Sequence, residues 1–159
     1  MIASKKDLNP KLIAEYSDEF KLLLIEIELK NWEIRVISGY GPQENWPKEK
    51  IMPFFIVLET EIDKAVLAGK SVIVESDANR KLGPTFIPKD PHKMSPTGAI
   101  LARIVERQNL TVVNGSTKCK GTLTRRRVTK YRAEESVIDL VLISNDMMKC
   151  LVEMQIDEG

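Results

Sequence analysis

The stretch VIVESDAN, residues 72–79, decides how the rest of the chain is interpreted. Its first half is a short β-branched apolar run, which is typical of a strand covered on both faces. Its second half leaves that strand through Asp77 and Asn79. Side chains at strand ends escape the packed layer, so both could face one ligand. The alternative is that Asp77 and Asn79 cap a turn through ordinary hydrogen bonds to the backbone.

Upstream of this stretch, the sequence predicts a β-hairpin followed by a helix. Apolar and charged residues alternate over residues 22–29 and again over 32–36, with the period of two expected for strands. From about residue 48 to residue 68, apolar residues follow helical spacing instead. Pro53 suits only the first turn of a helix, so we expect this helix to begin near Glu49 or later.

Downstream, a long loop over residues 78–94 contains Gly83 and three prolines, and Ser95 then opens a second helix that runs to about Gln108. Short runs predict strands over residues 110–113, 121–125 and 136–143. Residues 150–156 could add an edge strand. The order β-β-α-β-α-β-β-β predicts an α+β fold, in which a mixed sheet carries its helices on one side.

Composition limits the classes of protein that fit this chain. A length of 159 residues suits one domain with a substantial core. The 24 Lys and Arg residues nearly balance 23 Asp and Glu, so the overall charge does not argue for a nucleic-acid partner. Cys119 and Cys150 match no metal-binding spacing and predict reduced thiols in an intracellular protein, nuclear or cytoplasmic. No apolar run is long enough for the roughly 30 Å of a bilayer core, so we expect no membrane span.

Three further features could carry chemistry. Tyr40 lies at a strand end, between Gly39 and a Gly-Pro pair that define a loop. Asp139 interrupts the apolar run 136–143 and shares its strand face with Val141, so it is expected to need a partner or a functional reason. The alternative is that it points to the solvent face of an edge strand. His92 is the only histidine, and no dinucleotide, P-loop or zinc motif is present.

A basic segment spans residues 122–132. Its charge could contact a phosphate backbone, partly through bidentate guanidinium hydrogen bonds. The alternative is a solvated surface loop. The predicted nucleic-acid-binding residues are Arg125, Arg126, Arg127, Lys130 and Arg132.

Taken together, four motifs resemble the endonuclease/exonuclease/phosphatase superfamily, and within it the retrotransposon-encoded endonucleases. They are residues 34–42, residues 72–79, residues 95–98 with 110–115, and residues 136–144, in the family's order. The resemblance implies a four-layer α/β/β/α sandwich and hydrolysis of a phosphodiester with Mg²⁺ or Mn²⁺. It also implies roles for four residues. Tyr40 would bond the scissile phosphate, Asp77 would activate water, Asn79 would steady the phosphate, and Asp139 would orient a histidine.

The chain departs from that family pattern in three places. Ser76 stands where the family has glycine. The family's early strands, which carry a metal-binding glutamate, have no counterpart before Leu22, and its final serine-aspartate-histidine motif is missing. We therefore expect residues 1–21 to be an N-terminal extension and residues 22–159 a partial domain, with the metal ligands unknown.

Two functions follow from this partial resemblance. The first is an incomplete metal-dependent phosphodiesterase that acts on nucleic acid, or derives from such an enzyme, and is weak or inactive alone. The second is a non-catalytic module that kept the scaffold for binding or self-assembly. Half of a sandwich would expose a sheet face, which predicts self-association or a covering protein partner.

Overall fold

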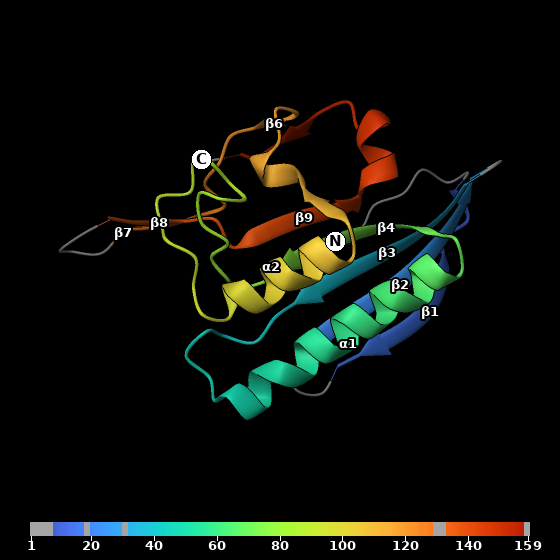
Figure 1. Ribbon diagram of the computed structural model, residues 1–159, viewed down its shortest axis with the longest axis horizontal. Coiled ribbons are helices and arrows are strands. Elements are labelled where there is room, and N and C mark those ends of the chain that lie inside the picture. The colour runs from blue at the N-terminus through green and yellow to red at the C-terminus, as the bar shows by residue number, and fades with distance from the viewer. Residues whose placement is uncertain (1–7, 18–19, 30–31, 129–132, 158–159) are drawn as a thin grey trace.

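The computed structural model describes residues 8–17, 20–29, 32–128 and 133–157. Its centre is a mixed six-stranded sheet in the order β1-β2-β3-β4-β9-β5 (Figure 1). Only β3 and β4 are parallel neighbours; the other pairs are antiparallel. The strands are β1 (Lys11–Tyr16), β2 (Lys21–Leu29), β3 (Trp32–Tyr40), β4 (Ser71–Asp77), β5 (Leu110–Val112) and β9 (Asp139–Ser144).

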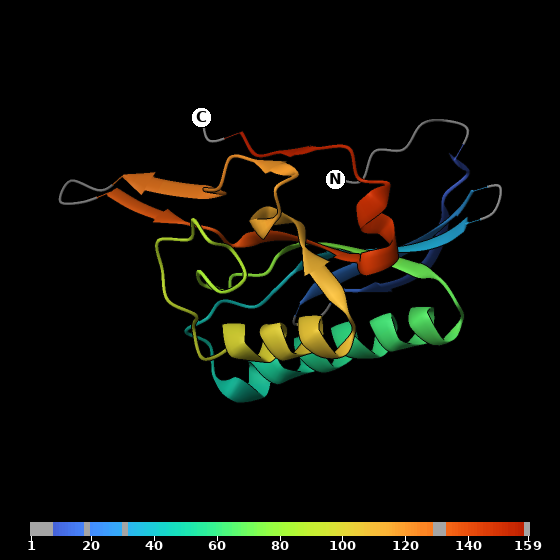
Figure 2. The same ribbon diagram turned by 45° about the horizontal axis from the view of Figure 1, so that its top comes forward.

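The hairpin and both helices predicted from the sequence are present. β2 and β3 pair from Lys21 opposite Tyr40 to Leu29 opposite Trp32. The helices α1 (Lys48–Leu67) and α2 (Gly98–Arg107) lie on the same side of the sheet (Figure 2). Their apolar stripes and one face of the sheet form the main core, where each large side chain removed from water contributes about 1.5–3 kcal/mol. The predicted one-sided α+β arrangement is confirmed.

The start of α1 differs from the prediction. The helix begins at Lys48, so Pro53 lies in its second turn and not in the first. A proline there removes one hydrogen bond to the carbonyl group four residues earlier, that of Glu49. Because Glu49 is solvent-exposed, water can bond that carbonyl group instead.

Short elements lie on the face of the sheet away from the helices. Val113 and Met147 are buried there, and Met148, Leu151 and Met154 are partly buried against β3, β4 and β9. This face of the sheet is therefore partly covered by the chain itself, and not wholly open as predicted. The elements are η2 (Val113–Gly115), β6 (Cys119–Lys120), η3 (Asn145–Lys149) and β10 (Met154–Gln155).

The prediction of a strand over residues 121–125 is wrong. Gly121 has φ +84°, which ends the extended run of β6 and turns the chain. The next strand, β7 (Arg125–Val128), pairs with β8 (Ala133–Ser136) in a separate hairpin that extends away from the body (Figure 1). Of the C-terminal edge strand predicted over residues 150–156, Met154–Gln155 forms the short strand β10, which pairs in parallel with β6 outside the main sheet.

Strand β1 lies within the stretch predicted as an N-terminal extension. It pairs with β2 at the edge of the main sheet, with an irregular register between Leu12 and Ala14. That irregularity breaks the simple alternation that would have marked the strand in the sequence. The boundary between residues 21 and 22 stays a prediction. Among the described residues, no helix has both the length and the apolar character needed to cross a membrane.

Candidate active site

Three strand ends bring Tyr40, Asp77 and Asp139 into one row. Tyr40 is the register partner of Asp77 across β3 and β4, and Asp77 is the partner of Asp139 across β4 and β9. Directly opposed residues on neighbouring strands point to the same face, with Cβ atoms roughly 5 Å apart. The structure therefore places all three side chains together on the face away from the helices. Their chemical roles remain predictions.

Asn79 joins this row through the turn that follows β4. Its backbone N–H donates to Asp77 Oδ1 at 3.2 Å, and its side-chain Nδ2 donates to the Gly41 carbonyl oxygen at 3.0 Å. The residue has φ +50°, a left-handed conformation that asparagine tolerates better than most residues. Asp77 and Asn79 thus do cap a turn, and the same turn holds Asn79 beside the carboxylate.

Ser76 is accommodated by a glycine on the neighbouring strand. It is buried and faces Gly39, its register partner in β3. A Cβ atom on Gly39 would lie 3.1 Å from Ser76 Oγ and 2.8 Å from a Leu22 methyl group. The missing side chain at position 39 therefore leaves room for serine, and Asp77 remains within β4.

Asp139 is exposed, which agrees with the alternative of a solvent-facing side chain and not with a buried carboxylate that needs a partner. The strand β9 begins at this residue, which places it at the open end of the sheet and not in the middle of an apolar strand. Its backbone is held on both sides. The Asp139 carbonyl oxygen accepts from Asn114 Nδ2 at 3.0 Å, and its N–H donates to Thr124 Oγ1 at 3.0 Å.

Asn114 and Thr124 are positioning residues that the sequence did not single out. Asn114 is buried, and its Oδ1 also accepts from the Val141 N–H at 2.9 Å, so its amide bonds two points of β9. Thr124 Oγ1 also accepts from the Ile138 N–H at 2.9 Å. The sequence placed Asn114 directly after an apolar run, which is equally common in ordinary turns, and within the motif at residues 110–115, but gave it no role.

Replacing Thr124 with valine is expected to destabilise the protein by about 1–2 kcal/mol, because two backbone N–H groups lose their acceptor. Urea unfolding followed by circular dichroism measures this change. Thr60→Val is a matched control, since the Thr60 hydroxyl donates to Ile56 on the exposed face of α1; its effect should stay within about 0.5 kcal/mol. Equal losses in the two variants would contradict the proposed anchoring.

Burial raises the pKa of the Asp77 carboxyl group above its ordinary value, and the nearby charge of Asp139 raises it further. The Asn79 N–H and the positive charge of Arg125 act in the opposite direction. Asp77 is therefore a stronger base than a free aspartate side chain, and Arg125 lies within electrostatic reach of it.

Among the five predicted basic residues, Arg125 is close enough for its positive charge to act on this carboxylate. Arg126 is exposed on β7, and its Nε lies 3.4 Å from Glu135 Oε1 on β8. Arg127 belongs to β7, but its side chain is not described. Lys130 and Arg132 lie outside the described residues.

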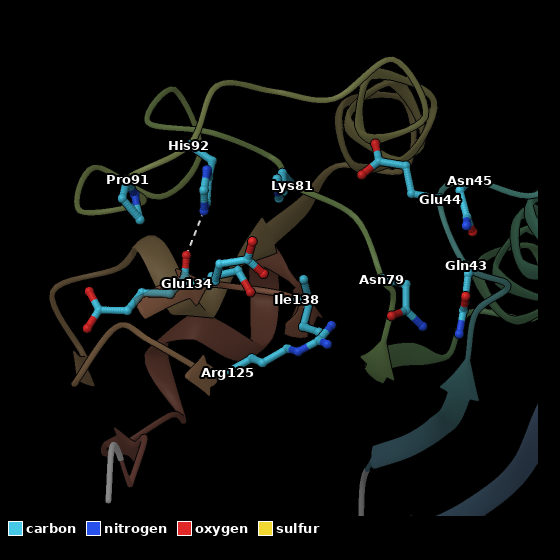
Figure 3. Close-up of a pocket in the computed structure, with 12 residues that line it drawn as sticks. Gln43, Glu44, Asn45, Asn79, Lys81, Pro91, His92, Arg125, Glu134 and Ile138 are labelled. Carbon is cyan, nitrogen blue, oxygen red and sulfur yellow. Dashed lines mark hydrogen bonds between the residues drawn. The ribbon is translucent and has the colours of Figure 1, made fainter. Parts of the chain in front are cut away.

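Two cavities flank the row. The smaller, of about 470 Å³, lies on the sheet face and is lined by Asp77, Asp139 and Asn114 among others. The larger, of about 840 Å³, lies between the loops after β3 and β4, the loop around His92 and the base of the β7–β8 hairpin (Figure 3). Asn79 and Arg125 line this larger cavity, so it begins where the row of candidate catalytic residues ends.

The residues of the row fit a divalent cation in part. Asp77 and Asp139 supply oxygen ligands of the kind that Mg²⁺ and Mn²⁺ prefer. A cation bound between them would also offset the repulsion between the two negative charges. Within the described ranges, no group of three or more His, Cys, Asp or Glu side chains could hold a metal ion. His92 lies on the far wall of the larger cavity, where Nε2 donates to the Glu135 carbonyl oxygen at 2.6 Å.

Arg80 is a second feature that the sequence did not reveal. It is fully buried, packs over the Phe55 ring at 5.7 Å, and donates from Nη1 to the Asn79 carbonyl oxygen at 2.8 Å. Burial lowers the pKa of its guanidinium group. This hydrogen bond holds the Asn79 backbone from the protein interior, so Arg80 acts as a positioning residue for the turn.

Solved structures with a similar fold include a retrotransposon endonuclease domain and TDP2 from two organisms. The endonuclease domain of TRAS1, a telomere-specific non-LTR retrotransposon, matches over 91% of this chain and 59% of its own, at 18% identity and a TM-score of 0.66. D. rerio TDP2, complexed with single strand DNA product, matches over 85% of this chain and 53% of its own, at 11% identity and a TM-score of 0.55. C. elegans TDP2 matches over 85% and 41%, at 8% identity and a TM-score of 0.53.

These similarities confirm the predicted fold. At such low identities they show the fold alone, which this chain shares with the TRAS1 endonuclease domain and with TDP2. The chain spans 59% of the TRAS1 domain and about half of D. rerio TDP2. No family model matches the sequence, and no curated protein matches it either.

Proposed function

We propose that this chain forms the phosphate-binding part of a divalent-metal-dependent nuclease site, with weak activity of its own. The observation that carries this proposal is the row of Tyr40, Asp77 and Asp139, joined by Asn79 at one end of the sheet. Nuclease folds among the similar structures support it. The substrate class is nucleic acid, because the basic residue Arg125 stands beside the row.

Each residue of the row would contribute one part of phosphodiester hydrolysis. The Tyr40 hydroxyl donates a hydrogen bond to a phosphate oxygen. Asp77, with its raised pKa, accepts the proton of the attacking water. The Asn79 amide and the Arg125 guanidinium hold the phosphate oxygens, the latter with a full charge.

A Mg²⁺ or Mn²⁺ ion would be held by the carboxylates of Asp77 and Asp139 and would neutralise phosphate charge. Two carboxylates are few ligands for a tight site, which is the physical reason for expecting slow turnover. The groups of such a site also act as a unit, so an incomplete set loses orders of magnitude in rate.

The test is cleavage of supercoiled plasmid and of single-stranded RNA by the wild-type chain, at high protein concentration, with Mg²⁺ or Mn²⁺. We expect slow nicking that stops when EDTA is added. Asp77→Asn, purified in parallel, identifies cleavage that belongs to this site. Nicking that survives EDTA, or that is equal in the two proteins, would overturn the proposal.

The basic hairpin gives a separate test of nucleic-acid binding. Changing Arg125 and Arg126 together to glutamine should weaken binding to duplex DNA and lower the slope of log Kd against log salt by about 1–2, as each lost phosphate contact removes a little under one unit. Fluorescence anisotropy at several salt concentrations measures both. Arg107→Gln, on α2 and paired with Glu59, is the control and should leave the slope unchanged. An unchanged slope in the double variant would exclude these contacts.

A second candidate, the non-catalytic binding or self-assembling module, is favoured by one surface. On the sheet face away from the helices, β1 and β2 present Leu12 and Leu23, which are 60% and 36% exposed, beside the half-buried Ile25 and Ile27. An apolar patch of this kind marks an interaction surface in many proteins. Absence of metal-dependent nicking, together with a mass in solution above that of one chain, would favour this candidate.

A further inference from the structure

Arg80 carries a positive charge in the protein interior that no carboxylate of the described residues pairs with. Its side chain is 0% exposed, and Nη1 donates to the Asn79 carbonyl oxygen at 2.8 Å. Within the described ranges, Nε and Nη2 have no hydrogen-bond partner, and the guanidinium group forms no ion pair. The Phe55 ring, 5.7 Å away, attracts the cation but does not cancel its charge.

A second buried arginine shows how a structural guanidinium group is accommodated in this protein. Arg35 on β3 is 7% exposed and pairs with Glu26 on β2 and with Glu61 on α1. These ion pairs offset the cost of removing the Arg35 charge from water. Arg80 lacks such partners, and an unpaired buried charge lowers stability. Its presence is therefore explained better by the electric field that it creates than by a contribution to stability.

The Arg80 charge lies directly behind the larger cavity. Asn79, which accepts its hydrogen bond, lines that cavity, and so does Glu44. Figure 3 shows these two residues on the side of the cavity opposite His92. Burial lowers the pKa of Arg80, and the charge of Glu44 raises it. A charge at the cavity wall and the guanidinium group therefore act on each other.

A buried cation attracts an anion in a different way from a surface cation. In a medium of effective dielectric constant about 20, a full charge at roughly 10 Å changes the affinity for an anion by roughly tenfold. Salt screens such an interaction only weakly. A surface cation such as Arg125 would contact the phosphate itself, and its effect would fall as salt rises. Arg80 is closed off from any ligand, so it can attract a phosphate without touching it.

We infer that Arg80 selects anionic ligands for this cavity, as a fixed positive charge behind Asn79 that draws a phosphate group to that side. The inference rests on the proposed function, in which the ligand is nucleic acid. It adds a specificity-determining residue that makes no contact with the ligand. Arg80 also holds the turn at Asn79, but the two roles can be separated, because the hydrogen bond needs only an N–H group and the field needs the charge.

Three substitutions at position 80 separate the charge from the hydrogen bond. Arg80→Gln retains an N–H donor without a charge, Arg80→Met retains neither, and Arg80→Lys retains both. Binding of a short DNA duplex is measured by fluorescence anisotropy in EDTA, so that cleavage plays no part, at low and high salt and at about pH 6 and pH 8, on either side of neutrality. Arg107→Gln is the control, because Arg107 is exposed on α2 and pairs with Glu59.

We expect Arg80→Gln to bind the duplex about tenfold more weakly than the wild type, by the same factor at low and at high salt. Arg80→Met should bind at least as weakly. Arg80→Lys should stay within about threefold of the wild type near pH 6, and weaken relative to it near pH 8, because burial lowers the pKa of a lysine. The control should change less than twofold.

Four results would overturn the inference. They are binding by Arg80→Gln within about twofold of the wild type, a loss that disappears at high salt, a loss for Arg80→Lys near pH 6 as large as that for Arg80→Gln, and no detectable binding by the wild type. The first would mean that the hydrogen bond to Asn79 is sufficient. The second would mean that the charge is screened like one at the surface.

Urea unfolding tests whether the charge is kept at the expense of stability. Arg80→Met should have a urea midpoint no lower than that of the wild type, because removal of an unpaired buried charge offsets the loss of one hydrogen bond. Arg35→Met should have a clearly lower midpoint, since Glu26 and Glu61 both lose a buried partner. A midpoint for Arg80→Met as low as that for Arg35→Met would make Arg80 a structural residue and overturn the inference.

The role of Arg80 and the proposed nuclease activity can fail separately. Binding that depends on the Arg80 charge, with no metal-dependent nicking, would retain the inference and remove the catalytic function. Asp77-dependent nicking by a protein whose binding is unchanged in Arg80→Gln would do the opposite.

Discussion

Replacing Asp77 with asparagine is expected to lower metal-dependent cleavage by about 100-fold or more, the usual effect of removing a general base. Asparagine keeps an oxygen that can accept the Asn79 N–H, so the turn should persist. What it lacks is a basic site for the proton of water and a negative charge for the cation. The plasmid nicking rate at saturating Mn²⁺ measures this loss.

The same substitution should make the protein more stable at neutral pH. The folded-state pKa of Asp77 is raised, by burial first and by Asp139 second. The contribution of such a carboxyl group to stability is fully present below its unfolded pKa and is lost as pH rises through its folded pKa. Asparagine does not ionise, so the Asp77→Asn protein keeps that stability as the pH rises. Its gain in unfolding free energy should therefore be largest at neutral pH and vanish below the ordinary pKa of 3.8.

The control for both measurements is Asp63→Asn, the same change on the exposed face of α1. Asp63 accepts from Gln108 through an oxygen that asparagine retains. It should leave both cleavage and the pH dependence of unfolding unchanged. An Asp77→Asn protein that cleaves at the wild-type rate would remove Asp77 from the site. One that is less stable than wild type at neutral pH would contradict the electrostatic description of the row.

Replacing Gly115 with alanine is expected to destabilise the fold by about 3 kcal/mol or more. A Cβ atom there would lie 1.8 Å from the Phe86 carbonyl oxygen and 3.2 Å from Ile87 Cα. Both are backbone atoms, so no side-chain rotation relieves the clash and the loop itself must move. That loop continues to Asp90, which accepts from the Gly83 and His92 N–H groups.

Gly69→Ala separates this clash from backbone strain. Gly69 has φ +73° and no atom within 4 Å of its added Cβ, so alanine there should cost only about 1–2 kcal/mol of left-handed strain. Urea unfolding of the two variants measures the difference. A smaller loss for Gly115→Ala than for Gly69→Ala would show that the loop after β4 is not packed against η2 as described.

Most of the regular elements could be predicted because each has a local pattern. The alternation in β2 and β3 and the helical spacing of α1 reflect which face of each element is buried, and this is written into neighbouring residues. The incorrect predictions of secondary structure had local causes as well. Pro53 lies in the second turn of α1, the register shift in β1 hides its period, and Gly121 ends a strand where a continuous one was expected.

The candidate site was predictable only in part. Asp77, Asn79 and Tyr40 could be assigned to strand ends, and the motif order suggested that they belong together. For Asp139 the sequence left a buried and a solvent-facing side chain both open, because the choice depends on where β9 begins. The anchoring of that start by Asn114 and Thr124 could not be predicted either, since side-chain to backbone hydrogen bonds between distant segments leave no periodic trace in a sequence.

By itself, then, the amino-acid sequence determined the strands and helices, the one-sided α+β arrangement and the residue types available for phosphate chemistry, since these depend on local patterns and burial. Only the tertiary structure decided that Tyr40, Asp77 and Asp139 share one row and that a cavity opens beside Asn79. It also decided that burial, and then the charge of Asp139, raise the pKa of Asp77. Those properties depend on strand register and loop packing, which are set by contacts between segments far apart in the chain.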